Sequence, residues 1–189
     1  VFFEELALPE AHHHLDVGSG THGAQTAKVL SGTEAVLSRD RPDIVMVQGD
    51  TNTVMAAALA AAKMGIRVGH VEAGLRSNDR TMPEEVNRVV ADHISDQLYA
   101  PTEEARKNLA REGIDRGVFV TGNTIVDAVQ ENRKLAGARS HVLENLGLKA
   151  RGFVLATAHR QENVDSPEKL KSILKALDSV GRETGLPVI

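Results

Sequence analysis

Three carboxylates stand at points in this chain where parallel strands are predicted to end. Asp50 closes the apolar run "DIVMVQGD", Glu72 closes "IRVGHVE", and Glu84 begins the predicted helix after the next loop. Ligands of an open parallel sheet bind outside the carboxyl ends of its strands, so we expect these acids to lie close together. Grouped carboxylates must be protonated in part or paired, which suits general acid/base chemistry. Taken singly, each acid is equally explained as a helix cap, a surface group or the partner of an arginine.

Arginines are interspersed with these acids. Arg76, Arg80 and Arg88 fall within residues 69–88, "GHVEAGLRSNDRTMPEEVNR". A guanidinium can hold a carboxylate in place or bind a phosphate through two parallel hydrogen bonds. The stretch therefore predicts either an internally paired acid cluster or a site with an anionic ligand.

A second polar group follows the predicted strand "FVLA" near the end of the sequence. His159 and Arg160 come directly after it, and Glu162 follows in "TAHRQEN". An adjacent His and Arg can meet a diphosphate through charge-assisted hydrogen bonds, with Glu162 orienting one of them. A loop ion pair is the alternative. An acidic group together with a cationic one suits a substrate with a neutral reacting part and an anionic handle, such as a nucleotide sugar.

The elements that must position these side chains alternate between β-rich runs and amphipathic helices. This pattern is typical of an α/β protein with a Rossmann-like parallel sheet covered on both faces. The predicted strands are 41–50, 66–72, 97–100, 117–122 and a last one from 152, and the predicted helices are 25–39, 51–65, 83–96, 101–114, 124–137 and 166–184. Gly122 and Asn123 either contact a substrate or form a turn.

Composition changes after residue 136. We predict a first Rossmann-like domain over 1–136 that lacks its first strand, and a linker with the start of a second domain over 137–189. We expect the chain to be truncated at both ends, because it opens without a strand and stops within one.

Size and charge limit the classes of function. With 189 residues and 41% hydrophobic residues, the chain can bury a core. A net charge of −4 argues against binding nucleic acid or an anionic membrane surface. The absence of cysteine excludes disulfides and thiolate zinc sites, and no apolar run approaches the roughly 20 residues of a membrane span. We expect a cytoplasmic protein.

Two motifs could indicate a dinucleotide site or a metal site, but a structural explanation is favoured for each. "GSGTHG" at 18–23 matches the dinucleotide-binding glycine pattern, but no good strand precedes it, and the acids about 20 residues on, Asp40 and Asp43, begin the next strand rather than end it. The run 12–14 is three histidines, whose side chains point in different directions on a helix or a strand, so a solvated turn is favoured over a metal site.

Five motifs in order resemble the non-hydrolysing UDP-N-acetylglucosamine 2-epimerases: "VQGDTNT", "GHVEAGLRSNDRTMPEEVNR", "APTEEARKNL", "VTGNTIVDAV" and "TAHRQENV". The resemblance runs over nearly the whole chain. It implies two Rossmann-like domains in a GT-B-like arrangement, a UDP-sugar substrate, a homodimer, a link to cell-envelope polysaccharide synthesis, and neither NAD nor a metal. The implied reaction interconverts UDP-N-acetylglucosamine and UDP-N-acetylmannosamine through elimination and re-addition of UDP.

The resemblance also assigns residues. It implies that Asp50, Glu72 and Glu84 are the acid/base carboxylates and that His159 is an active-site histidine. Supporting residues that orient the acids or contact substrate are then Arg76, Arg80, Arg88, Asn123, Arg160 and Glu162, with Glu85 and Asn87 beside them.

Several features depart from the family pattern. Its N-terminal strand and its C-terminal substrate-binding segment are absent, and the loop between Glu72 and Glu84 is shorter than in many bacterial members. Ala24-Gln25 stands where some members carry an Arg-Gln pair that binds an activator, so we do not expect activation of that kind. The alternatives are a hydrolysing 2-epimerase, a glycosyltransferase of the same two-domain plan, and a nucleotide-sugar-binding module without catalysis.

Overall fold

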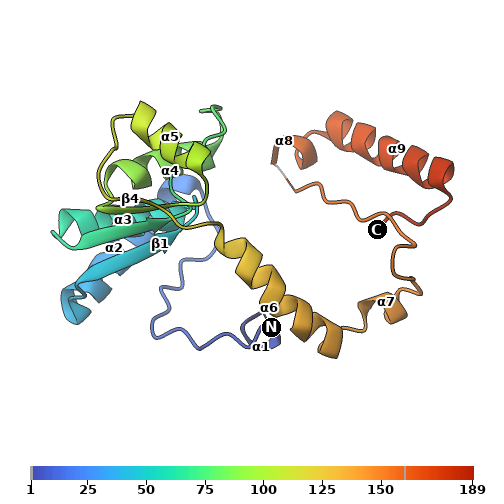
Figure 1. Cartoon of the computed structure of the whole chain (residues 1–189), viewed down its shortest axis with the longest axis horizontal. Helices are drawn as coiled ribbons and strands as arrows, with labels where there is room; N and C mark the ends of the chain where they lie inside the picture. Colours follow the sequence, from blue (N-terminus) through green and yellow to red (C-terminus); the bar gives the residue numbers. More distant parts are fainter. Residues whose placement is uncertain (1, 160) are drawn as a thin grey trace. The chain divides into compact units, whose positions relative to one another are not determined.

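The computed structural model describes residues 2–159 and 161–189 of the chain (Figure 1). It divides into two compact units, Val1–Glu131 and Asn132–Ile189, with the division inside one long helix.

The first unit alternates helices and strands as predicted. Its elements are α1 (Phe2–Glu5), α2 (His22–Asp40), β1 (Ile44–Gln48), α3 (Asn52–Lys63), β2 (Arg67–Val71), α4 (Pro83–His93), β3 (Gln97–Ala100), α5 (Glu103–Arg111), β4 (Val118–Val120) and the start of α6 (Thr124–Arg139). The four strands form a parallel sheet in the order β1-β2-β3-β4. The predicted α/β class with a parallel sheet is confirmed.

The strand register brings the ends of β1 and β2 to one edge of the sheet. Gln48, the last residue of β1, pairs with Val71, the last residue of β2, and Val71 pairs in turn with Tyr99 of β3. The amide of Gly49 then donates to the carbonyl of Val71 at 3.1 Å, which extends the pairing by one residue. Residues that directly follow β1 and β2 therefore emerge beside each other.

Local sequence explains where the helices at this edge begin. Thr51 caps α3 by accepting a hydrogen bond from the amide of Val54, and Thr102 caps α5 by accepting one from Ala105. Such a cap stabilises a helix by about 1 kcal/mol. Helix α4 begins with Pro83, whose fixed φ suits the first helical position, and acids follow in its first turn.

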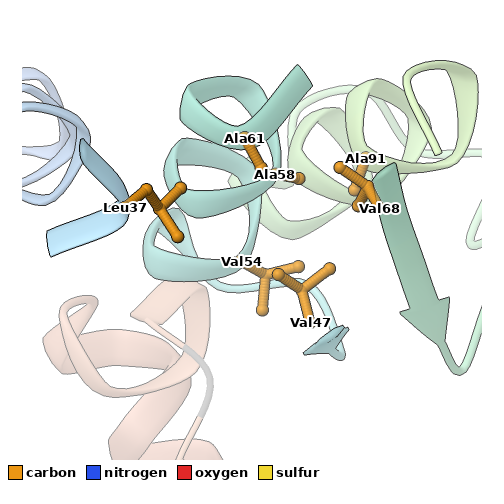
Figure 2. Close-up of a cluster of buried hydrophobic side chains, with 7 residues drawn as sticks. All are labelled: Leu37, Val47, Val54, Ala58, Ala61, Val68 and Ala91. Carbon is orange, nitrogen blue, oxygen red and sulfur yellow. The ribbon is translucent and has the colours of Figure 1, made fainter. Parts of the chain in front are cut away.

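A cluster of seven buried side chains holds β1, β2 and three helices together (Figure 2). Helix α3 lies at its centre and packs against α2, α4, β1 and β2. The alanines of α3 allow this close approach because they carry only a methyl group. The members are Leu37, Val47, Val54, Ala58, Ala61, Val68 and Ala91. This packing joins β1 and β2 to α2, α3 and α4.

The second unit is less regular. It holds the remainder of α6, α7 (Val142–Asn145), α8 (Gln161–Val164) and α9 (Pro167–Thr184). The strand expected from residue 152 is present only as an isolated parallel bridge between Val154 and Val188. The amides of Val154 and Ala156 donate to the 187 and 189 carbonyls at 2.9 Å, so the backbone is extended but pairs with one neighbour over very few residues. A parallel pair needs more strands beside it to be stable.

Candidate acid/base site

The three predicted acids lie at one edge of the sheet in the first unit. Asp50 follows β1 by two residues, Glu72 directly follows β2, and Glu84 lies in the first turn of α4. Asp50 and Glu72 are half-buried, whereas Glu84 is exposed. The register of β1 and β2 places Asp50 and Glu72 at neighbouring strand ends, as the sequence predicted.

Arg88 connects α4 to Asp50. One terminal nitrogen of its guanidinium donates to Oδ2 of Asp50 at 2.5 Å, and the other donates to Oε2 of Glu85 at 3.0 Å. Its Nε is buried and has no hydrogen-bond partner among the described residues. Arg88 is four residues after Glu84, so the two side chains rise from the same face of the helix. Helix α4 is therefore attached to Asp50 one turn after Glu84.

The backbone beside Asp50 is held as well. The amide group of Asn87 donates to the carbonyl oxygen of Asp50 at 2.9 Å and to Oδ1 of Asn52 at 3.2 Å. Asn87 is 5% exposed. Asp50 is thus fixed through both its side chain and its main chain by consecutive residues of α4.

Glu72 has an unusual backbone. Its φ of +71° lies in the left-handed region, which costs a non-glycine residue roughly 1–2 kcal/mol. The amides of Glu72 and Ala73 both donate to the carbonyl of Tyr99, at 3.1 and 3.2 Å. Gln48 donates to Oε1 of Glu72 at 3.0 Å and to Oγ1 of Thr124 at 3.1 Å. A strained residue held by several contacts is typical of a functional position.

Glu85 organises the loop before α4. It is 3% exposed and accepts hydrogen bonds from the amides of Ser77 and Asn78 at 2.9 and 3.0 Å. Burial alone would raise the pKa of this carboxyl, but the hydrogen bonds from Ser77 and Asn78 and the charge of Arg88 outweigh it and lower the pKa. Glu85 is therefore an ionised internal anchor of the loop.

Arg76 faces the interior. Its side chain is 5% exposed and donates to Oδ2 of Asp92 at 2.7 Å and to both carboxylate oxygens of Glu112 at 2.7 Å. Burial alone would lower its pKa, but these hydrogen bonds and the two negative charges raise it above its usual range. Of the two supporting roles open to Arg76, this geometry favours orienting the loop over contact with a ligand.

His70 and Asp92 were missed by the sequence analysis. Nδ1 of His70 and Oδ1 of Asp92 are 2.7 Å apart, and Nε2 of His70 lies 2.8 Å from the carbonyl oxygen of Gly49. Both side chains are fully buried. The available signal was a polar residue inside each of two apolar patterns, the strand "IRVGHV" and the helix segment "VVADH".

The other candidates stand outside this network. Arg80 is exposed, and Asn123 is exposed with its Oδ1 accepting from the amide of Ile125 at 3.0 Å, which caps the first turn of α6. In the second unit, His159 is exposed and its Nδ1 lies 3.2 Å from Oγ1 of Thr157. Arg160 and the side chain of Glu162 lie outside the described residues.

The part of the chain that the structure describes holds neither a metal-binding cluster nor a membrane-spanning helix. Among the described residues, no three His, Asp or Glu side chains are grouped as a metal ion requires. Within the same part of the chain, every helix is too short or too polar to cross a membrane.

Comparison with known proteins places this arrangement in a family. The family model described as UDP-N-acetylglucosamine 2-epimerase matches residues 1–189. The chain belongs to the UDP-N-acetylglucosamine 2-epimerase family. The resemblance seen in the five sequence motifs is thereby confirmed.

Individual epimerases support this assignment. The UDP-N-acetylglucosamine 2-epimerase of Methanocaldococcus jannaschii is 54% identical over 180 residues, which cover 94% of this chain and 49% of that relative. A UDP-2,3-diacetamido-2,3-dideoxy-D-glucuronate 2-epimerase of Pseudomonas aeruginosa is 41% identical over 181 residues, covering 95% of this chain and 50% of that protein.

Solved structures agree. A crystal structure of the M. jannaschii epimerase in complex with UDP-N-acetylglucosamine and UDP matches with a TM-score of 0.90 and 51% identity, covering 99% of this chain and 52% of that one. The Neisseria meningitidis epimerase bound to UDP-N-acetylglucosamine matches with a TM-score of 0.85 and 33% identity, covering 94% and 50%. The chain spans about half the length of these epimerases.

Proposed function

We propose that the enzyme containing these residues interconverts UDP-N-acetylglucosamine and UDP-N-acetylmannosamine. The main support is the arrangement at one sheet edge, where Arg88 joins Asp50 to helix α4 one turn after Glu84, and Gln48 holds Glu72 at the neighbouring strand end. The two relatives described above are named as 2-epimerases of UDP-N-acetylglucosamine and of a related UDP-sugar.

The chemistry explains why several carboxylates are required. The proton on C2 of an N-acetyl sugar is weakly acidic, so a positioned base must remove it. The electron pair of the C2–H bond forms a C1=C2 double bond while the C1–O bond to UDP breaks, and UDP leaves with the electron pair of the C1–O bond. Inversion at C2 follows when a proton is delivered to the opposite face of C2 and UDP adds back to C1. A base on one face and an acid on the other are therefore needed.

Asp50, Glu72 and Glu84 are the groups that we propose for these transfers. They come from three different elements, so they can approach a sugar ring from different sides. The guanidinium of Arg88 forms an ion pair with Asp50, and its buried Nε is a donor without a described partner. Which acid removes the proton and which delivers it is left open.

We propose a second set of residues for the diphosphate. His159 and Arg160 would stabilise the negative charge that develops on departing UDP, with Glu162 orienting one of them. Arg80 and Asn123 are exposed polar groups of the first unit and are proposed as substrate contacts. In this scheme the reaction uses neither NAD nor a metal, and we propose that the enzyme acts as a homodimer.

The test uses a chain of the length of the curated relatives that contains these 189 residues. Incubation with UDP-N-acetylglucosamine should produce UDP-N-acetylmannosamine, seen by proton NMR, with no accumulation of free sugar. Accumulation of N-acetylmannosamine and UDP would identify a hydrolysing enzyme instead. Binding of the nucleotide sugar without any product would identify a non-catalytic module.

A second substrate is favoured by one observation, the 41% identity to an epimerase of a 2,3-diacetamido glucuronate. The chemistry at C2 is the same for both sugars, so the acid cluster does not distinguish them. Parallel assays with the two UDP-sugars decide between them, because the true substrate should show the higher kcat/KM.

A further inference from the structure

The three elements that carry the acids share a buried chain of polar contacts. His70 lies on β2, two residues before Glu72, and its Nε2 is 2.8 Å from the carbonyl of Gly49, the residue before Asp50. Its Nδ1 is 2.7 Å from Asp92, which lies on α4, the helix that carries Glu84. The side chains of His70 and Asp92 have no exposed surface.

The partners of His70 and Asp92 determine where most of the protons lie. A carbonyl oxygen can only accept, so Nε2 of His70 carries a proton and donates it to Gly49. The contact between Nδ1 of His70 and Oδ1 of Asp92 holds one further proton. Oδ2 of Asp92 accepts from the amide of Gly74 at 3.1 Å and from Arg76 at 2.7 Å. Asp92 is therefore fully engaged, and Arg76 is in turn paired with Glu112.

The carboxylate of Asp92 also fixes the loop after Glu72. Gly74 has a φ of +79°, and a Cβ there would collide with the carbonyl of Ala105 in α5, so only glycine fits. With Glu72 also in the left-handed region, the backbone from 72 to 76 follows one path, which the bonds from Asp92 to Gly74 and Arg76 hold in place.

We propose that His70 and Asp92 are positioning residues for the acid/base cluster. They touch no substrate, and they act by connecting the end of β1, the end of β2 and helix α4 so that Asp50, Glu72 and Glu84 keep their relative places. This inference rests on the proposed function. A role in stability alone is disfavoured, because apolar residues packed in place of a buried ion pair are often at least as stabilising.

The experiment compares three variants of an enzyme-length chain that contains these residues. Asp92→Ala removes the bonds to His70, Gly74 and Arg76. His70→Asn is milder, because its amide nitrogen takes the place of Nδ1 and still donates to Asp92, so only the bond to Gly49 is lost. Leu37→Ala is the matched control. It opens a cavity in the core at the α2–α3 contact and removes none of the hydrogen bonds of His70 or Asp92.

Positioning predicts a loss of kcat with little change in KM. A displacement of about 1 Å can lower a rate by about 100-fold, so we expect that loss for Asp92→Ala and about 10-fold for His70→Asn, with KM within about threefold. Rates are divided by the folded fraction. Leu37→Ala should keep kcat despite its lower stability. A kcat equal to wild type in folded His70→Asn and Asp92→Ala would overturn the proposal, and His70→Asn alone decides if Asp92→Ala does not fold.

Amide hydrogen exchange gives a readout that does not depend on activity. We expect the amides of Glu72 and Gly74 to exchange faster in Asp92→Ala than in Leu37→Ala at matched stability. Equal exchange at these amides would contradict the positioning role. If the wild-type chain shows no epimerisation, the proposed function fails, and the exchange result still decides whether His70 and Asp92 hold the strand ends.

Discussion

The stability of the protein should depend on one of two neighbouring glutamates at the start of α4 and hardly on the other. Glu85 is 3% exposed and accepts three hydrogen bonds, from the amides of Ser77 and Asn78 and from Arg88. Glu84 is exposed. Replacing either by glutamine removes one charge and keeps the shape, so the pair separates the internal anchor from the proposed catalytic acid.

The expected stability loss follows from the contacts of Glu85. In Glu85→Gln one carboxylate oxygen becomes an NH2 group, which cannot accept hydrogen bonds from the donors that surround it. Hydrogen bonds to a charged group are worth about 1.5–3 kcal/mol. We therefore expect Glu85→Gln to lower the free energy of unfolding by about 2 kcal/mol. With a urea m-value of about 2 kcal/mol/M, the midpoint falls by about 1 M. Glu84→Gln should stay within about 0.5 kcal/mol of wild type.

Tyr99 provides the assay. It is the single tyrosine of a chain without tryptophan, and it lies on β3 in the first unit, so its fluorescence reports unfolding of that unit alone. Urea titrations at neutral pH then give the midpoints of the three proteins. The reasoning is refuted if Glu84→Gln loses as much stability as Glu85→Gln, or if Glu85→Gln unfolds at the wild-type midpoint.

The remaining predictions concern pH, Arg88, Glu72 and a helix cap. The lowered pKa of Glu85 means that its stabilisation is present above its ordinary value of 4.5 and is lost as the pH falls through the folded value, so the urea midpoints of wild type and Glu85→Gln should converge in acid. Arg88→Met leaves the carboxylate of Glu85, 4% exposed, without its charged partner, and should cost about 3–5 kcal/mol by the same titration. Arg88→Lys should lose epimerisation, because one ammonium cannot span Asp50 and Glu85 as the guanidinium does. A wild-type kcat in this variant would contradict that view. Glu72→Gly should abolish epimerisation while changing stability by less than about 1 kcal/mol, since relief of the left-handed strain offsets the entropy cost of glycine. Thr102→Ala, which removes the side-chain cap of α5, should cost about 1 kcal/mol of unfolding free energy by the same titration.

The sequence predicted the elements whose signals are local. The apolar runs of β1 and β2, the alanine-rich helix α3 and the Pro83 start of α4 were all recognisable, and so was the placement of Asp50 and Glu72 at strand ends. The segment at Val154 was predicted as a strand but forms only a bridge, because a strand depends on neighbours and not on its own sequence alone.

Side-chain direction depended on partners far along the chain. Arg76 could have faced a ligand or the interior, and Asp92 and Glu112, 16 and 36 residues further on, turn it inward. His70 looked like an ordinary interruption of an apolar strand, because its bonds to Gly49 and Asp92 span 21 and 22 residues. Such non-local contacts leave no pattern of spacing in the sequence.

The most direct test of the central claim is solvent deuterium incorporation at C2 of UDP-N-acetylglucosamine. An enzyme-length chain containing these residues should exchange the C2 proton for deuterium during epimerisation, and Glu84→Gln should lose that exchange while keeping the far-UV circular dichroism spectrum of the wild type. Absence of exchange in the wild-type chain, or equal exchange in Glu84→Gln, would contradict acid/base catalysis by this carboxylate cluster.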